Sequence, residues 1–206
     1  MGDKYANIAF TKTVKSLQES MGSRGLYARA SGGPDYNDRF GPDERAFIFS
    51  RDSFYVASVS ETGWPYVQFR GGPPGFLRVL DEKTLGFADF RGNRQYLTTG
   101  NVATDDRVSL FLMDYVHRRR LKIFGRMRAV ATGEDPRIAS ELAPANYPAV
   151  IERAFLITLD AFNWNCPQHI TPRYTEVEFA NLVGKIPTAP LGRGQGTEPN
   201  DSRSPL

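Results

Sequence analysis

The chain has 206 residues, which is long enough to bury the core of one domain without disulfide staples. Its formal net charge of +3 is mild, so composition gives no reason to expect nucleic-acid binding. The single cysteine, Cys166, favours a reducing compartment. The sequence shows no signal-peptide core and no apolar run of membrane-spanning length. We therefore expect a cytoplasmic protein without membrane contact.

The first 50 residues predict an N-terminal extension of helices and loops. Apolar residues at helical spacing predict one helix with a single apolar face, formed by Phe10, Val14, Leu17 and Met21. Residues 31–40 are rich in glycine, proline, aspartate and asparagine, which is typical of a loop. Pro42 and the acidic residues after it predict the first turn of a short helix.

From residue 51 the pattern becomes that of a β domain, which we expect to reach residue 186. Aromatic and β-branched stretches predict strands over residues 54–60, 64–70, 76–80, 84–90, 107–113, 120–130 and 154–162. Short helices are expected over residues 92–101 and 135–142. About six strands with few helices indicate a mainly β fold that forms a small closed or nearly closed barrel.

The last segment, residues 187–206, differs from the rest of the chain in composition. Glycine, proline, serine, threonine and charged residues dominate it, and it has almost no apolar side chains to bury. Burial therefore would not offset the entropy of ordering these residues. We expect a flexible tail.

The segment 87–94 has the features of a phosphate site. A strand ends there, Gly92 opens a turn and a helix is expected to begin, which provides free backbone N–H groups and a positive dipole end. Arg91 and Arg94 add guanidinium groups, whose geometry and charge match phosphate oxygens. A solvated basic turn is the alternative interpretation.

The segment 64–72 has the features of a surface for a planar ring. Gln68 and Arg70 alternate on one face of the expected strand, and Gly71 and Gly72 let backbone approach a ligand closely. Such donors suit a ring with several carbonyl and imine acceptors. The alternative is a barrel strand that ends in a glycine bulge.

Two further polar segments carry the histidines. His117–Arg120 is basic but lacks stacking aromatic residues, so it indicates a charged hairpin end rather than a nucleic-acid patch. Residues 162–169 include Cys166 and His169, yet one cysteine and two histidines are too few for a structural zinc site. A thiol nucleophile would need a base that sequence cannot place. We expect the segment to pack against a ligand or a partner subunit, and we expect no metal.

The sequence lacks the common nucleotide-binding and hydrolase motifs. It has no Gly-x-Gly-x-x-Gly after a strand, no Walker lysine loop and no nucleophile-elbow serine. Any nucleotide is therefore not expected to bind in the Rossmann manner.

The order of these segments resembles the pyridoxamine 5'-phosphate oxidase-like family of flavin-binding split barrels. The similarity lies in the order of four segments along the chain. They are Thr62-Gly63-Trp64-Pro65-Tyr66, Gly92-Asn93-Arg94, and the stretches 106–111 and 119–126. The runs 70–75 and 163–170 resemble a less characterised branch of the family. The resemblance covers roughly two-thirds of the chain and implies a six-stranded Greek-key split β-barrel, a homodimer and FMN at the dimer interface.

The resemblance also implies which residues bind the cofactor. Arg94 corresponds to a basic residue on the FMN phosphate, with Gly92 and Asn93 in the same loop and Arg91 or Arg70 assisting. Ala88 and Asp89 correspond to positions where backbone and side chain meet the flavin. The remaining implied contacts come from Gln68, Phe69, Arg70 and Gly71 beneath the ring, Arg120 near it, and Trp164 and Gln168 in the segment that reaches the flavin of the other subunit.

Departures from the family pattern concern the substrate more than the flavin. The true oxidases carry serine-arginine-lysine at the phosphate loop and an arginine where Gln68 stands, and they end in a substrate-holding segment that this chain lacks. We therefore expect an FMN-dependent oxidoreductase that uses a small-molecule electron donor or acceptor. No catalytic residue is assigned. We also expect that removal of the residues from Thr188 onward leaves flavin binding intact.

Three alternatives remain open from sequence. The first is a non-enzymatic flavin-binding module. The second is a haem-binding split barrel with His117 or His169 as the axial ligand. The third is a deazaflavin enzyme of the same fold.

Overall fold

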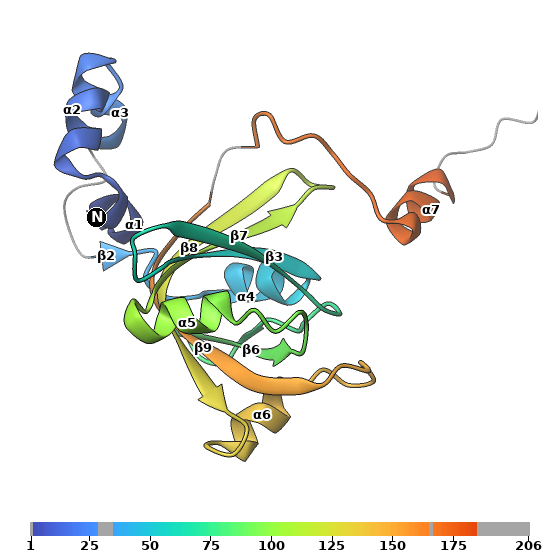
Figure 1. The fold of residues 1–206 in the computed structure, drawn as a ribbon. Helices are drawn as coiled ribbons and strands as arrows, with labels where there is room; N and C mark the ends of the chain where they lie inside the picture. Colours follow the sequence, from blue (N-terminus) through green and yellow to red (C-terminus); the bar gives the residue numbers. More distant parts are fainter. Residues whose placement is uncertain (1, 29–34, 165–166, 185–206) are drawn as a thin grey trace, which may run out of the picture. The chain divides into compact units, whose positions relative to one another are not determined.

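The computed structural model describes residues 2–28, 35–164 and 167–184. Contacts group the chain into two compact units, residues 1–172 and residues 173–206. Figure 1 shows the elements of the first unit, which contains all of the β domain's strands. The expected flexible tail, 187–206, and Cys166 lie outside the described residues.

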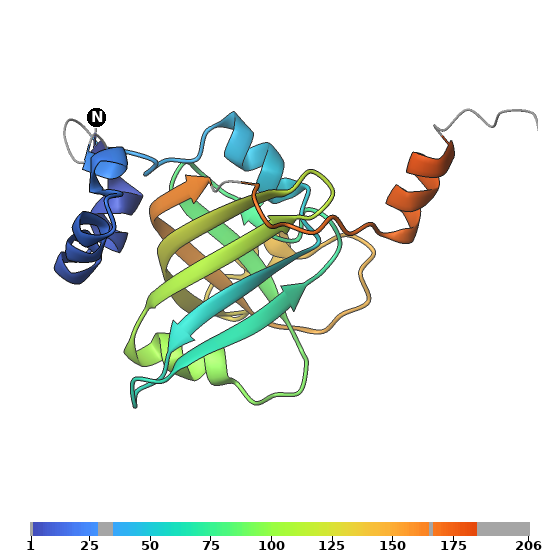
Figure 2. The same ribbon diagram turned by 90° about the horizontal axis from the view of Figure 1, so that it is seen from above.

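The first unit is built around one antiparallel sheet. Its strands are β3 (Ser53–Val59), β4 (Pro65–Gly71), β5 (Arg78–Val79), β6 (Thr84–Phe90), β7 (Arg107–Asp114), β8 (Arg119–Ala131) and β9 (Ile151–Trp164). They follow the order β4-β3-β7-β8-β9-β6-β5, so the hairpins β3–β4 and β5–β6 flank the meander β7–β8–β9. Figure 2 shows the sheet rolled into a barrel.

This arrangement confirms the mainly β split barrel with flanking helices that the sequence predicts. The strand count differs in a minor way, because the sheet has six long strands and a seventh, β5, of only two residues. The β5 hairpin is short because Gly72 and the proline-glycine run after it keep the chain irregular until residue 78.

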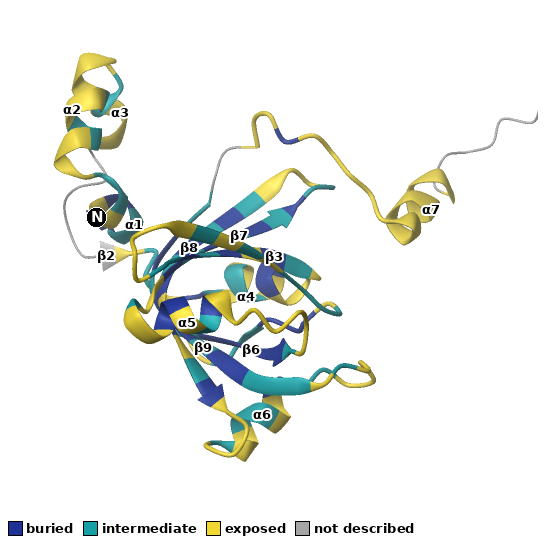
Figure 3. Cartoon of the chain, in the orientation of Figure 1, coloured by how far each residue is buried: buried dark blue, intermediate teal, exposed yellow. Residues whose placement is uncertain are grey.

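Alternate residues of β3, β7 and β8 fill much of the barrel interior, and β6 is buried on both faces. In β3 the buried positions are Phe54, Val56 and Ser58, while the residues between them face outward. Aromatic rings dominate the centre, where Phe87 lies 5.2 Å from Phe54 and 5.3 Å from Phe155 between ring centroids. Figure 3 shows the buried residues concentrated on the strands.

Three short helices flank the barrel: α4 (Pro42–Phe49), α5 (Leu97–Thr104) and α6 (Pro136–Leu142). The helix expected to begin at Pro42 is therefore present, and Phe47 and Ile48 bury it against the core. The side chain of Glu44 accepts a hydrogen bond from the backbone N–H of Gly41 at 2.9 Å, which closes the first turn. Asp135 caps α6 by accepting from two backbone N–H groups.

The N-terminal extension differs from the single helix that the apolar spacing predicts. It contains β1 (Gly2–Asp3), α1 (Lys4–Ala9), α2 (Lys12–Ser20), α3 (Arg24–Ala28) and β2 (Asp35–Tyr36). The helix is interrupted because Thr11 leaves the helical conformation and its hydroxyl caps α2 by accepting from the N–H of Val14. Leu17 and Met21 are consequently exposed.

The second unit contains one described helix, α7 (Glu176–Gly184). The β domain is predicted to extend to residue 186, whereas the last described strand ends at Trp164 and residues 173–184 group with the second unit. Over the described part of the chain, no helix is both long enough and apolar enough to cross a lipid bilayer.

Candidate functional site

A cavity of about 210 Å³ lies between β4, the loop after β6, the start of α5 and the start of β9; we call it the polar cavity. Six residues predicted to bind a cofactor line it: Gln68, Arg70, Asp89, Gly92, Asn93 and Arg94. The other lining residues are Phe90, Gln95, Tyr96, Leu97, Thr98, Thr99 and Glu152. Folding thus brings the segments 64–72 and 87–94 to one place.

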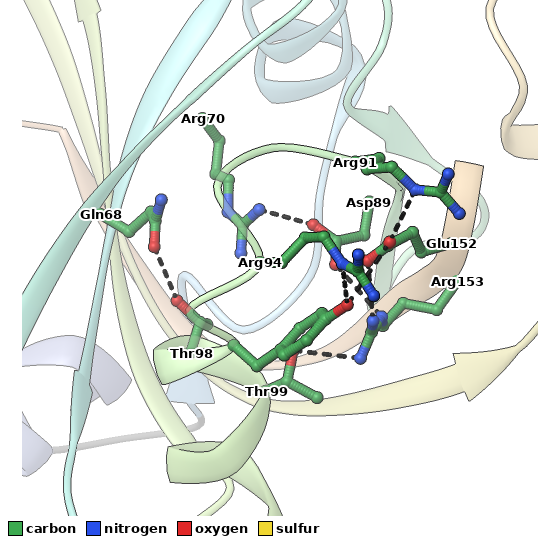
Figure 4. Close-up of polar contacts among 10 residues, drawn as sticks. Gln68, Arg70, Asp89, Arg91, Arg94, Thr98, Thr99, Glu152 and Arg153 are labelled. Atoms are coloured by element: carbon green, nitrogen blue, oxygen red, sulfur yellow. Dashed lines mark hydrogen bonds and ion pairs between the residues drawn. The ribbon is translucent and has the colours of Figure 1, made fainter. Parts of the chain in front are cut away.

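Asp89 lies at the base of this site, held between two arginines (Figure 4). Arg70 reaches from β4 to donate from Nη1 to its Oδ1 at 2.6 Å, and Nε of Arg153 lies 3.2 Å from its Oδ2. Burial raises the pKa of Asp89, although Arg70 and Arg153 act in the opposite direction. The carboxylate is therefore a structural counterion that orders both guanidinium groups.

The two arginines keep hydrogen-bonding capacity that the protein does not use. Nε of Arg70 and Nε of Arg153 are both buried without a hydrogen-bond partner among the described residues. The ion-pair distance from Arg153 to Asp89 does not satisfy its N–H, because the group is not aligned for a hydrogen bond. A buried donor without a partner is costly, so both groups favour a ligand or water with acceptor atoms.

Glu152 binds a second pair of arginines at the cavity rim. Its Oε1 lies 3.0 Å from Nε of Arg91, and its Oε2 lies 3.0 Å from Nη2 of Arg153. The hydrogen bond from Arg91 is the main reason that the pKa of Glu152 is below its ordinary value. Arg94 donates from Nε to the hydroxyl of Tyr96 at 3.2 Å, which leaves the rest of its guanidinium exposed.

The helix near the cavity begins later than the sequence predicts. It was expected to start at Gly92, but α5 starts at Leu97, and residues 91–96 form a loop. Arg94 and Tyr96 have positive φ angles of 61° and 55°, a conformation that non-glycine residues rarely adopt. Arg94 is therefore a loop residue, not one step inside a helix, and the first backbone N–H groups of α5 belong to residues 97–99.

Hydroxyl and amide groups line the β4 side of the cavity. The side-chain oxygen of Gln68 accepts from the hydroxyl of Tyr66 at 2.7 Å and from that of Thr98 at 3.4 Å. Thr99 accepts from Nη1 of Arg153 at 3.4 Å, which ties α5 to β9. The strand and the helix start are thus linked directly across the cavity.

The charges around the polar cavity are unbalanced. Arg70, Arg94, Asp89 and Glu152 line the cavity, and Arg91 and Arg153 adjoin it through ion pairs with these two carboxylates. The cluster as a whole therefore has four guanidinium groups and two carboxylates. The excess of positive charge and the first amides of α5 meet in one polar cavity, which suits an anion such as a phosphate.

Three predicted residues next to the cavity point away from it. Phe69 is 57% exposed on the outer face of β4, where its ring packs edge-on against Tyr55. Gly71 follows at the end of the strand, beneath the Phe69 ring. Ala88 is buried on the other face of β6, in the small cluster with Leu142. Strand alternation separates all three from Gln68, Arg70 and Asp89.

Arg120, Trp164 and Gln168 are also absent from the lining of the polar cavity. Arg120 pairs with Met113 on the β7–β8 hairpin. The indole N–H of Trp164 donates to Glu44 at 2.7 Å, and its ring packs against Phe47 of α4. Gln168 is exposed beyond β9. Within this chain they do not form a site with the cavity residues.

Both histidines are exposed and lie away from the polar cavity. His117 is exposed, with Nδ1 2.9 Å from Oδ2 of Asp114, and His169 is exposed in a turn. Neither lines the polar cavity. In the ranges that the structure describes, no group of three or more His, Cys, Asp or Glu side chains is arranged to hold a metal ion.

Sequence reasoning missed Tyr96, Thr98, Thr99, Glu152 and Arg153. The hydroxyl residues were assigned to the interior of a helix, because the start of α5 was placed too early. Arg153 lies directly opposite Asp89 in the β6–β9 ladder, 64 positions later in the chain. The available signal in the sequence was the charged pair Glu152-Arg153 just before an apolar strand. Only the strand register shows which residues this pair faces.

Comparison with known proteins identifies the family. The family model for pyridoxamine 5'-phosphate oxidase matches residues 40–162, which is more than half of the 206 residues. The chain belongs to the pyridoxamine 5'-phosphate oxidase family. The matched range includes every strand of the barrel except the end of β9, and all residues that line the polar cavity. No curated protein matches the chain.

Solved structures of similar fold are distant in sequence. HupZ from Group A Streptococcus is 15% identical, with a TM-score of 0.50, and the match covers 66% of this chain and all of that one. A putative pyridoxamine 5'-phosphate oxidase from Lactobacillus delbrueckii is 17% identical over 61% of this chain and 94% of that one, with a TM-score of 0.47. An FMN-binding protein from Syntrophomonas wolfei is 10% identical over 75% and 96%, with a TM-score of 0.45. The HupZ comparison supports the fold alone.

Proposed function

We propose that this member of the pyridoxamine 5'-phosphate oxidase family is an FMN-dependent oxidoreductase that binds the FMN phosphate in the polar cavity. The observation that carries the proposal is the excess of guanidinium groups over carboxylates around that cavity, next to the start of α5. Family membership supports a flavin as the phosphate-bearing ligand. The substrate is unassigned.

The residues present fit a phosphate monoester. Near neutral pH such a group carries close to two negative charges and three acceptor oxygens. Four arginines and two carboxylates leave two positive charges to match it. The buried, unpartnered Nε group of Arg153 supplies a donor for the phosphate, and Arg94 and the amides of residues 97–99 supply more.

The size of the cavity supports a site that a second subunit completes. Pockets that enclose a whole drug-sized ligand measure roughly 300–1,000 Å³, whereas the polar cavity measures about 210 Å³. It has room for a phosphate and part of its attached chain. The ring would therefore lie outside the enclosed volume of the cavity, over Gln68 and Arg70 on β4. We propose that another copy of the chain covers the ring.

The protein's contribution is orientation and electrostatics. When bound, the flavin itself supplies hydride and electron transfer. Arg94, Arg153 and the start of α5 would hold the phosphate end, and Gln68 and Arg70 would donate hydrogen bonds toward the ring. Asp89 keeps Arg70 and Arg153 in place and balances part of their charge.

The proposal is tested with FMN and riboflavin, which differ only by the phosphate. Each is titrated into the wild type, Arg94→Ala and the control Arg128→Ala, whose guanidinium is exposed and lies outside the cavity. We expect Arg94→Ala to weaken FMN binding roughly tenfold or more, to leave riboflavin binding unchanged, and the control to bind both as wild type does. Equal affinity of the wild type for FMN and riboflavin would refute a phosphate role for the cavity.

Enzymatic turnover requires a separate measurement. Purified protein is expected to show paired flavin absorption bands, and the bound flavin should bleach with NADH or NADPH and recover in the presence of an acceptor. A non-enzymatic flavin carrier would show the bands but no reaction with either nucleotide. A haem Soret band, or binding of a deazaflavin in preference to FMN, would replace the cofactor assignment.

A further inference from the structure

A second cavity, of about 570 Å³, lies between α4, β5 and α6. It is lined by Arg45 and Phe49 from α4, Arg78 and Leu80 from the β5 region, and Glu141 from α6. No residue lines both this α4–α6 cavity and the polar cavity. Its volume falls within the range of pockets that enclose a whole small molecule.

Arg78 is the distinctive residue of the α4–α6 cavity. Its Nε is buried without a hydrogen-bond partner, and no described residue forms an ion pair with its guanidinium. An unsatisfied buried donor on a charged group is unfavourable and unusual in a native protein. The residue is half-buried, so the group is oriented by its surroundings rather than free in solvent.

The other charges near Arg78 do not compensate it. Arg45 makes a long contact, 3.5 Å from Nη1 to the carbonyl oxygen of Val79, and interacts electrostatically with Asp81, but it forms no ion pair with a described residue. Glu141 is the one carboxylate in the lining, and it is exposed and pairs with neither arginine. The cavity therefore has a net positive charge and unused donors, which favour an anionic group.

The rim of the cavity carries an aromatic ring held in a defined position. Phe49 ends α4, lines the cavity and is 64% exposed, so its ring is accessible to a ligand. Its ring packs on Gly75, which has a φ of +83° and where a Cβ atom would lie 2.8 Å from the ring. A glycine in this conformation thus makes room for the ring, which offers a face for stacking.

We propose that the α4–α6 cavity binds a small aromatic acid, whose anionic group pairs with Arg78 and Arg45 and whose ring stacks on Phe49. The argument is independent of the proposed flavin site, because the two cavities share no residue. A carboxylate and a phosphate both present acceptor oxygens to a guanidinium, so either suits the anionic position. The aromatic body distinguishes this ligand from a free inorganic anion.

The direct test follows the Nε–H signals of the arginines by nitrogen-15 NMR in the full-length protein. The Arg78 signal is identified by its loss in Arg78→Lys. Benzoate and phenyl phosphate are added in turn, with inorganic phosphate and benzyl alcohol as probes of each half of the ligand. We expect a saturable shift of the Arg78 signal with at least one aromatic acid, a weaker response to inorganic phosphate, and none to benzyl alcohol.

Variants test the two contacts separately. Arg78→Met should weaken binding of the aromatic acid about tenfold or more, while Arg137→Met, an exposed arginine of α6 outside the lining, should bind as wild type does. Phe49→Ala should weaken the aromatic acid without changing the response to inorganic phosphate. An Arg78 signal that does not shift, or an equal response to inorganic phosphate and both aromatic acids, would overturn the proposal. The wild-type titration needs only Arg78→Lys, which assigns the signal and keeps the positive charge, so it decides the question even if Arg78→Met or Phe49→Ala fails to fold.

Discussion

At the scale of single residues, the polar cavity depends on Arg153, which has partners on three elements. It pairs with Asp89 of β6 and its neighbour Glu152, donates to Thr99 of α5, and lies over the ring of Tyr96 at 4.9 Å. Its side chain is only 19% exposed. Such an arginine orders the loop, the helix start and the strand together, so its loss affects stability as well as anion binding.

We expect Arg153→Met to lower the free energy of unfolding by about 3 kcal/mol, because it leaves Asp89 buried with one partner instead of two. Urea denaturation at neutral pH measures the change. Arg128→Met is the matched control, since that arginine is exposed and its one ion pair, with Glu134, is long at 3.7 Å. This substitution should lower the free energy of unfolding by less than about 0.5 kcal/mol. Equal effects of the two substitutions would contradict the role of Arg153.

The cost of Arg153→Met should also depend on pH. The pKa of Asp89 is raised on folding, so protonation of this carboxyl favours the folded state below its unfolded pKa, and that benefit is lost as the pH rises through the folded value. Removal of a positive neighbour raises the folded pKa further. The destabilisation should therefore be largest at neutral pH and shrink as the pH falls below the ordinary carboxyl range. A cost that does not change with pH would exclude ionised Asp89 as its cause.

At the scale of elements, the pairing of the two longest strands, β8 and β9, is irregular at one point. The register shifts between Phe124 and Gly125, where Gly125 of β8 faces Leu159 of β9. A Cβ atom on Gly125 would lie 2.6 Å from the backbone oxygen of Thr158 and 2.8 Å from Ile157. The close approach of two backbones explains why a glycine is required inside a strand.

We expect Gly125→Ala to destabilise the protein by about 2–3 kcal/mol, because the nearest atom belongs to backbone that cannot move aside without disturbing the ladder. A lower midpoint of thermal unfolding would report this loss. An unchanged circular dichroism spectrum at low temperature would show that the variant still folds. If the variant unfolds like wild type, the two strands are further apart at this point than the structure shows.

Gly100 in α5 should respond in the opposite direction. A Cβ atom there meets nothing within 4 Å, the residue is exposed, and it lies inside the helix. Gly100→Ala should stabilise the protein by about 0.5–1 kcal/mol, since alanine has the higher helix propensity. The same thermal measurement applies, and a decrease in stability would mean that another chain approaches α5 at this position.

At the scale of the whole molecule, the barrel has an apolar outer face that no described helix covers on β3 and β4. Tyr55, Val67 and Phe69 are 39%, 61% and 57% exposed there, and Trp64 is 75% exposed at the adjacent turn. An exposed apolar patch on a small domain indicates an interaction surface. A second copy of the chain is the partner we propose, and it would bind the face of β4 opposite to the one that carries Gln68 and Arg70.

We expect the wild type to be a dimer at micromolar concentration and Phe69→Glu to be monomeric, because a buried charge at the centre of this patch would be unpaired. Light scattering coupled to size exclusion measures both. Met21→Glu is the control, since Met21 is 81% exposed in the N-terminal extension. A monomeric wild type would refute the dimer.

The sequence by itself determined the fold class and the family of this protein, together with six of the thirteen residues that line its polar cavity. Strand alternation acts over a few positions, so Gln68 and Arg70 were predicted to share one face of their strand, and both line the cavity. Only the tertiary structure decided that Arg153 faces Asp89, because that pairing depends on the β6–β9 register. It also decided where α5 begins, since backbone dihedrals at Arg94 and Tyr96 reflect packing around the loop rather than local propensity.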